Sequence, residues 1–395
     1  MAAFSRWRGR RFRHRQKGRS KGGGGSGSTF LWWVSFGCGA FLSILVWLPG
    51  LTLWDIPGDK GEQPQQTEMP VDATSGGTNG TGDERFVPEA PAARKSGPSV
   101  SQLPDERESS PIDRVTVNVL VTDEQRVETV PIEAYVRGVV AGEMPADFEP
   151  EALKAQAIAA RTYIVRKLRL NAGNAGNAGE ASPRYDVTDA TEDQVYIPAE
   201  RLKKLRQTGA EAKLGAIERA VEATKGLIVT YDGEPIQAAF FSTSSGYTEN
   251  SEDYWDQPLP YLRSVPSPWD KAVSPRYKQE VEMSLQEFYA KLGIKKKKKM
   301  PLRVTGLTEG RRVREFAVGA YTFTGRDTRE KLGLPSSKFT WVVTGDRIVF
   351  TTYGYGHGVG MSQWGANALA KAGKTAEQIL QYYYTGVRIE QASNL

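Results

Sequence analysis

The stretch that decides the fold runs from Val139 to Pro145, VVAGEMP, and resumes from Phe148 to Tyr163 as FEPEALKAQAIAARTY. Its first half ends an apolar helix that begins near Pro131, and its second half belongs to a helix predicted from Glu151 to about Leu170. At about 100° per residue, one stripe of the second helix should face the core. That stripe consists of Leu153, Ala157, Ala160 and Ile164.

Four polar side chains in this stretch are candidates for chemistry. Glu143 lies at the end of an apolar helix, where partial burial would raise its pKa and suit it to general acid catalysis; the alternative is a solvent-facing glutamate. Lys154 and Arg161 lie along one border of the core stripe and Gln156 along the other. Such border positions either line a cleft or let Lys and Arg extend over the edge of the core.

Working outward, alternation and turn signals predict further strands and helices. The predicted strands form three hairpins, at 115–121 with 127–130, at 227–231 with 236–241 around Asp232-Gly233, and within 342–350. Further helices are predicted at 211–224, 362–372 and 375–384. The triple Asn-Ala-Gly run at 171–179 predicts a flexible loop, and the five lysines at 295–299 a solvated loop or a contact for an anionic wall polymer. This pattern predicts an α+β region with one large core or two packed subdomains.

A glycine-dense segment, YGYGHGVGMSQWGA, runs from Tyr353 to Ala366. Its spacing does not fit a dinucleotide or phosphate loop, and alternating glycines allow close approach of the backbone to a ligand. We expect it to bring His357, Ser362 and Gln363 to the rim of the cleft that contains Glu143. No serine has a nucleophile-elbow signature, which argues against Ser-His-Asp hydrolysis. A third segment, FFSTSSGYTE at 240–249, adds two candidate substrate-binding residues, Ser242 and Tyr247.

The N-terminal part differs from the rest of the 395-residue chain. Nine Lys and Arg precede the first acidic residue, Asp55, so the net charge of +6 becomes −3 over residues 55–395. Residues 30–48 carry no charge and are flanked by tryptophans, which predicts a transmembrane anchor over 30–54 rather than a cleavable signal peptide. The basic tail, 1–29, would then be cytoplasmic. Residues 55–113, rich in Pro, Gly, Ser and Thr, should form a disordered linker, and 114–395 an extracytoplasmic catalytic region.

Counts of rare residues exclude several classes of site. The single cysteine, Cys38, excludes a disulfide framework and a thiolate zinc site. Two histidines, His14 and His357, are too few for a His-rich metal centre. The basic tail would suit a nucleic-acid binder, but the predicted membrane span directly after it argues against nucleic acid as a partner.

The Gly-Glu-Met-Pro segment with its helical continuation, and the Gly-His-Gly-Val-Gly-Met-Ser-Gln-Trp-Gly-Ala segment, resemble the stage II sporulation protein D family over roughly residues 115–390. This resemblance implies a membrane-anchored lytic transglycosylase that cleaves peptidoglycan strands during engulfment in sporulation. It also implies a cell-wall amidase and a membrane scaffold protein as partners. The family's catalytic glutamate falls on Glu143, and its motif Lys, Gln and Arg fall on Lys154, Gln156 and Arg161.

Some members of that family hold zinc with one His and two Cys before a Gln-Val-Tyr segment. Residues 186–196 contain neither residue type, so we expect no metal and no cofactor. The implied reaction needs one carboxyl group, because the muramic acid 6-hydroxyl serves as nucleophile and yields a 1,6-anhydro product, whereas ordinary glycosidases use two. The alternative function is a non-catalytic glycan-binding activator of a partner amidase.

Overall fold

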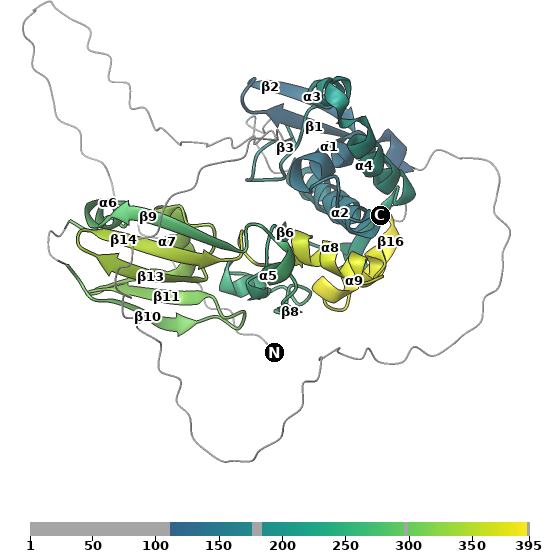
Figure 1. The fold of residues 1–395 in the computed structure, drawn as a ribbon. Coiled ribbons are helices and arrows are strands. Elements are labelled where there is room, and N and C mark those ends of the chain that lie inside the picture. The colour runs from purple at the N-terminus through teal and green to yellow at the C-terminus, as the bar shows by residue number, and fades with distance from the viewer. Residues whose placement is uncertain (1–110, 176–183, 296–298, 393–395) are drawn as a thin grey trace, which may run out of the picture. The chain divides into compact units, whose positions relative to one another are not determined.

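The computed structural model describes residues 111–175, 184–295 and 299–392 (Figure 1), which fold as a mixed α/β region. The expected fold class is corrected in one respect, since none of the described helices is long and apolar enough to cross a bilayer. Even the 26-residue helix α2 (Pro150–Ala175) carries Lys and Arg along its length. The segments predicted as tail, anchor and most of the linker, 1–110, lie outside the described residues.

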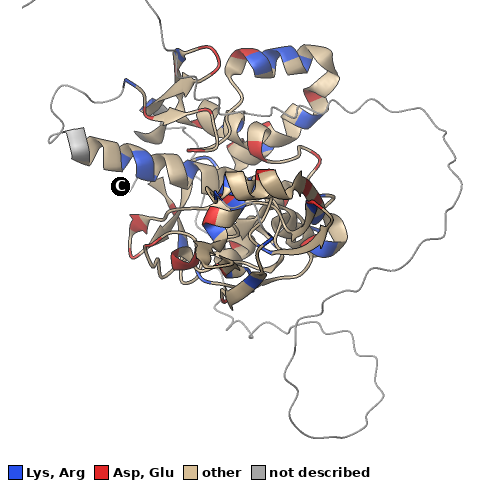
Figure 2. Ribbon diagram, turned by 90° about the vertical axis from the view of Figure 1, so that its left-hand side faces the viewer, with Lys and Arg blue, Asp and Glu red and all other residues tan. Residues whose placement is uncertain are grey.

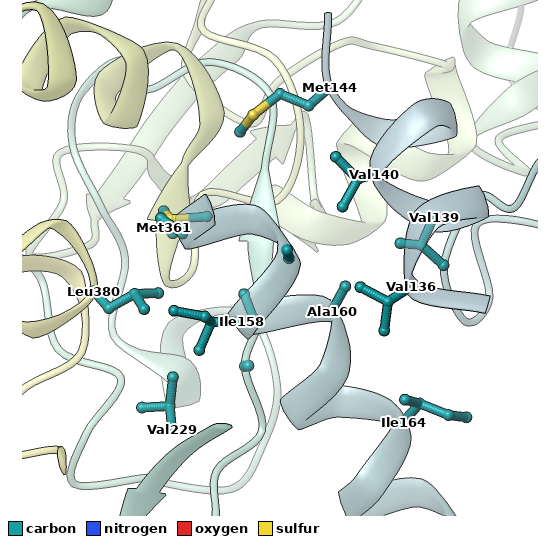
Figure 3. Packing of buried hydrophobic residues seen from close by; sticks show 14 of the residues in the cluster. Val136, Val139, Val140, Met144, Ile158, Ala160, Ile164, Val229, Met361 and Leu380 are labelled. Atoms are coloured by element: carbon teal, nitrogen blue, oxygen red, sulfur yellow. The ribbon is translucent and has the colours of Figure 1, made fainter. Parts of the chain in front are cut away.

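The larger hydrophobic core is built around α2, which contacts strand β4 (Leu227–Tyr231) and four helices. These helices are α1 (Ile132–Glu143), α4 (Glu211–Ala223), α8 (Gln363–Lys371) and α9 (Ala376–Tyr383). In Figure 3, valines of α1 lie on one side of α2, and Met361 and Leu380 lie on the other. From Ala152 to Ile164 every side chain except Lys154 and Tyr163 is buried. The expected single stripe is therefore corrected to a helix that is buried on nearly all sides.

Small sheets border this core, and the first of them confirms the predicted N-terminal hairpin. Strands β1 (Thr116–Val121) and β2 (Arg126–Pro131) pair antiparallel, and β3 (Val187–Thr188) adds in parallel to β1. Residues Pro111–Arg114 precede this sheet as a 3-10 helix whose Ile112 is buried in the core. Helix α2 extends five residues beyond its expected end at Leu170, where the Asn171 amide donates to the Asp186 carbonyl oxygen (3.5 Å). The rest of the Asn-Ala-Gly run, from 176, lies outside the described residues.

The predicted hairpin at 227–241 is partly wrong. Strand β4 pairs with β5 (Glu234–Pro235) and, on its other edge, with β16 (Arg388–Gln391). The chain then bends, because the Ala239 amide donates to the Gln237 carbonyl oxygen (2.7 Å). After this bend, β6 (Phe240–Phe241) pairs in parallel with β15 (Met361–Ser362) instead of continuing the hairpin. This pairing brings the glycine-dense segment next to residues 240–242.

A second core lies in residues 278–353, which we call the β subdomain. It contains two three-stranded sheets with the orders β13-β14-β9 and β10-β11-β12. Their strands are β9 (Lys278–Ser284), β10 (Leu302–Leu307), β11 (Val313–Val318), β12 (Tyr321–Thr324), β13 (Phe339–Thr344) and β14 (Arg347–Tyr353), with helices α6 (Leu285–Lys291) and α7 (Gly325–Leu332). Figure 1 shows these elements grouped together. The β13-β14 hairpin was predicted, and the other elements of this subdomain were not.

The remaining elements are short. They are α3 (Ala199–Leu205), a π-helical turn (Arg206–Ala210), β7 (Gly246–Tyr247), a 3-10 turn (Ser251–Asp253), β8 (Pro266–Ser267) and α5 (Asp270–Val273). Figure 2 shows Lys and Arg interspersed with Asp and Glu over the described ribbon. Residues of both charge signs are therefore spread along the described elements, consistent with the small net charge outside the basic tail.

Candidate active site

A cleft of about 900 Å³ is lined by residues from the region of the larger core and from the β subdomain. The larger core contributes the end of α1, the loop at 191–195, the segment at 237–242 and Gln363 of α8. The tip of the glycine-dense loop at 355–357 and the pair Tyr254-Trp255 form further parts of the wall. The β subdomain contributes Arg326, Arg329 and Glu330 of α7. The cleft therefore joins segments that are up to about 220 residues apart in sequence.

Glu143 is the last residue of α1 and lines this cleft. The helix ends there because Pro145 disfavours helical backbone in the residue before it, and Met144 is extended and buried. One carboxyl oxygen of Glu143 accepts a hydrogen bond from the Val195 amide (2.8 Å). Burial raises the pKa of Glu143 to about 7, and the Val195 amide and the Gln363 side chain offset part of this rise. A carboxyl group with this pKa can both donate and accept a proton at neutral pH.

The approach of the 191–195 loop to Glu143 depends on a glycine. A Cβ atom at Gly142 would lie 2.7 Å from the Val195 carbonyl oxygen, so a larger residue would push the loop away. The loop itself is held by Asp193, which accepts hydrogen bonds from the Tyr163 hydroxyl (2.7 Å), the Lys167 ammonium (3.0 Å) and the Thr188 amide (2.8 Å). These donors lower the pKa of Asp193 despite its partial burial, so it remains ionised.

His357 lies in the same cleft as Glu143, on a loop whose four glycines, 354 to 360, all have positive φ. Its ring lies 5.3–5.7 Å from the rings of Phe241, Tyr254 and Trp255, and its Nδ1 accepts a hydrogen bond from the Val359 amide (3.1 Å). Burial and nearby arginines lower the pKa of His357 to about 3. His357 is therefore neutral and a poor proton acceptor at neutral pH.

The other candidates from the C-terminal half are placed differently. Ser242 and Gln363 line the cleft. Ser362 is fully buried, where its hydroxyl donates to Asp270 and accepts from the Gly365 amide as the N-cap of α8. Tyr247 lies outside the cleft lining, with the Arg311 guanidinium 4.5 Å from its ring centroid.

The three α2 candidates do not line the cleft. Lys154 pairs with Glu151 (2.7 Å), and Arg161 is fully buried, donating to both carboxyl oxygens of Glu133 (2.8 and 2.7 Å). Gln156 is also fully buried, and its side-chain amide has no hydrogen-bond partner among the described residues. Gln156 and Arg161 do not reach the cleft because other elements cover them, and Lys154 is instead paired with Glu151. Their binding role stays a prediction.

Sequence reasoning missed several cleft residues. Tyr254 and Trp255 stand out as an aromatic pair in the polar stretch SEDYWDQ, and this signal could have found them. Arg326 and Arg329 offered no comparable signal, because the helix that carries them was not predicted. Gln194 was missed because its place in the cleft wall depends on residues far away in sequence, such as Tyr135. Among the described residues, no group of three or more His, Cys, Asp or Glu side chains is placed to hold a metal ion.

The chain is similar in sequence to a protein-family model and to several known proteins. The family model SpoIID, described as "Stage II sporulation protein", matches residues 121–231. The "Stage II sporulation protein D" of Bacillus subtilis is 50% identical over 280 residues, which cover 70% of this chain and 80% of the relative. The protein of that name from Bacillus amyloliquefaciens is 46% identical, over 71% and 80% of the two chains.

A more distant relative carries a different name. The "Amidase enhancer" of Bacillus subtilis is 31% identical over 308 residues, which cover 64% of this chain and 40% of that protein. The two proteins named for stage II sporulation are matched over most of their own length and at much higher identity. The chain therefore belongs to the stage II sporulation protein D family.

Proposed function

We propose that this protein is a peptidoglycan lytic transglycosylase of sporulation in which Glu143 is both general acid and general base. The observation that carries the proposal is a carboxyl group with a pKa of about 7 in the wall of a cleft of about 900 Å³. A cleft of this size can hold more than one sugar ring. Since peptidoglycan lies outside the cytoplasmic membrane, the region at 114–395 would act there.

The geometry of Glu143 fits a single-carboxyl mechanism. Protonated Glu143 would donate its proton to the glycosidic oxygen as the bond to the anomeric carbon breaks. The resulting carboxylate would then accept the proton of the muramic acid 6-hydroxyl, whose oxygen bonds to the same carbon and closes the 1,6-anhydro ring. The Val195 amide (2.8 Å) would hold one carboxyl oxygen in place through both steps.

The cleft wall carries three other carboxylates, of which Glu192 is exposed and the other two are already engaged. Asp193 accepts from donors on three residues, and Glu330 accepts from Arg326 (2.9 Å) and the Tyr254 hydroxyl (3.1 Å). A retaining or inverting hydrolase would need a second carboxylate free to act as nucleophile or base. Their contacts argue against Asp193 and Glu330 in that role, which is consistent with a reaction in which the substrate supplies its own nucleophile.

The test compares the full-length wild type with Glu143→Gln on purified peptidoglycan, with products identified by mass spectrometry. We expect the wild type to release 1,6-anhydro-muramyl ends and the variant to lose about 10²- to 10⁴-fold of the rate or more. The matched control is Glu200→Gln, at an exposed position outside the cleft lining. Reducing-end products from the wild type would identify a hydrolase, and an unchanged rate in Glu143→Gln would remove this residue from the mechanism.

A second candidate function, a non-catalytic activator of a cell-wall amidase, is favoured by the relative named "Amidase enhancer". Under this function the wild type produces no new glycan ends and increases the rate at which a purified amidase releases stem peptides. Glu143→Gln would then stimulate the amidase as strongly as the wild type. Measuring both products in the same reaction separates the two functions.

A further inference from the structure

Two glutamine side chains lie buried in the wall of the Glu143 cleft with unused hydrogen-bond donors. Gln194 is 2% exposed and Gln363 is 5% exposed, and both line the cleft. The Nε2 atom of Gln194 makes no hydrogen bond with the described residues, and that of Gln363 makes none of good geometry, although its side chain lies close enough to Glu143 to lower the pKa of that carboxyl group. Buried polar groups in native proteins nearly always have partners, so two such amides in the wall of one cleft need an explanation.

The orientation of each amide is set by its surroundings. The Oε1 atom of Gln194 accepts a hydrogen bond from the buried Tyr135 hydroxyl (3.2 Å), which assigns the opposite end of the amide to the nitrogen. The next residue, Val195, donates its backbone amide to Glu143, so Gln194 is tied to the position of this carboxyl group. Gln363 begins α8 directly after its N-cap, and its amide lies near enough to Glu143 to influence that carboxyl.

The chemistry of the free atoms defines the ligand group. An amide nitrogen donates hydrogen bonds and accepts none, so the two Nε2 atoms require an oxygen acceptor. An anionic acceptor would be repelled by Glu143 whenever that residue is ionised. A neutral carbonyl oxygen meets both conditions. On a peptidoglycan strand, the neutral carbonyl that recurs on every sugar is that of the 2-acetamido group.

We propose that the Nε2 groups of Gln194 and Gln363 form a two-donor subsite that binds the acetamido carbonyl oxygen of the sugar beside Glu143. This inference rests on the proposed function for the identity of the glycan. The subsite would orient the ring next to the acid and favour 2-acetamido sugars over sugars with a 2-hydroxyl group. A site built to hydrogen-bond a substrate group rejects analogues that lack the group, because its buried donors are then left unpaired.

The experiment measures binding by calorimetry, so it does not depend on cleavage. The probes are an N-acetylglucosamine tetramer and a glucose tetramer with the same β-1,4 linkage, which differ in the 2-acetamido group and are both uncharged. The full-length chain with Glu143→Gln serves as background, to which Gln194→Met and Gln363→Met are added separately. Met keeps a similar shape and removes the amide. Gln257→Met, at an exposed position outside the cleft lining, is the control.

We expect the background protein to prefer the acetylated tetramer by at least tenfold, and each cleft variant to reduce this preference about 3- to 10-fold. Affinity for the glucose tetramer should not fall in any variant, because that tetramer leaves the two donors unpaired. If Gln194→Met fails to fold, as judged by thermal unfolding, Gln194→Glu replaces it, since Glu keeps the acceptor for Tyr135 and lacks the donors.

An equal loss of affinity for both tetramers, or an unchanged preference in both cleft variants, would overturn the subsite. These outcomes are independent of the proposed reaction. A preference for the acetylated tetramer that both cleft variants reduce, together with no anhydro product from the wild type, would refute the transglycosylase and leave the subsite standing. Anhydro products together with an unaltered preference in the variants would do the reverse.

Discussion

Replacing Glu143 by glutamine should stabilise the folded protein at alkaline pH while it removes cleavage. Glu143 pays a desolvation penalty when it ionises, because its carboxyl group lies in the wall of a cleft beneath the 191–195 loop. Glutamine occupies a similar volume, keeps an oxygen that can accept from the Val195 amide, and carries no charge at any pH. The variant should therefore escape the penalty.

The magnitude follows from the pKa, which rises from an ordinary 4.5 to about 7 on folding. At about 1.36 kcal/mol per pKa unit, ionisation of Glu143 costs the folded state up to about 3 kcal/mol. Because the folded state holds its proton more tightly, this cost is absent below about pH 4.5, grows between pH 4.5 and 7, and is complete above pH 7. Glu143 is half-buried, so we expect a stabilisation of about 1–3 kcal/mol at pH 8.5.

Urea unfolding of the full-length wild type and Glu143→Gln at pH 4.5 and pH 8.5 measures this difference. The effects of other ionisable groups cancel, since the comparison is between two chains at one pH. Glu200→Gln, an exposed substitution, should show no such pH-dependent gain. A difference in unfolding free energy that is the same at both pH values would contradict a raised pKa, and a variant that is less stable at pH 8.5 would contradict the desolvation argument as well.

Two further predictions concern the packing behind the glycine-dense loop. Arg312 and Glu249 form a buried ion pair (3.8 Å), so Arg312→Met should lower the free energy of unfolding by about 3–5 kcal/mol, and the added change Glu249→Leu should recover most of it in urea unfolding. Little recovery would mean that the hydrogen bond from Arg312 to the Gly356 carbonyl oxygen (2.8 Å) matters more than the charge. Gly358→Ala should destabilise more than Gly373→Ala. Both glycines have positive φ, so alanine is strained at either position. A Cβ atom at 358 would also lie 2.6 Å from the Arg312 guanidinium carbon, whereas a Cβ atom at 373 would have no contact within 4 Å among the described residues. Equal shifts in melting temperature would show that the loop relaxes around the methyl group.

Local patterns were sufficient where an element depends on its own residues. The N-terminal hairpin is readable because alternate residues of Thr116–Val121 are buried, and α9 is readable because Thr375 and Gln378 form a capping box. The β subdomain was mostly missed for the opposite reason. In β12, Tyr321–Thr324, aromatic and polar residues alternate over only four positions and none of them is buried, so the pattern is too short to indicate a strand.

Position within the fold was harder to predict than secondary structure. Helical angles correctly place Leu153 and Ile164 in the core, but they cannot say that other elements also cover the sides that carry Gln156 and Arg161. Arg161 is satisfied by Glu133, 28 residues earlier in the chain, and no local pattern announces that pairing. The 191–195 loop depends in the same way on distant donors such as Tyr163.

The two ends of the β subdomain are adjacent, because Lys278 of β9 pairs with Tyr353 of β14. This adjacency bears on how the chain reaches its native state. If residues 278–353 fold first, their two ends are held next to each other. The flexible chain that connects β6 to β15 then falls from roughly 120 to roughly 45 residues. The entropy cost of bringing β6 and β15 together then falls by about 1 kcal/mol. The wall that holds His357 and Gln363 would therefore assemble late, after an autonomous nucleus elsewhere in the chain has already formed.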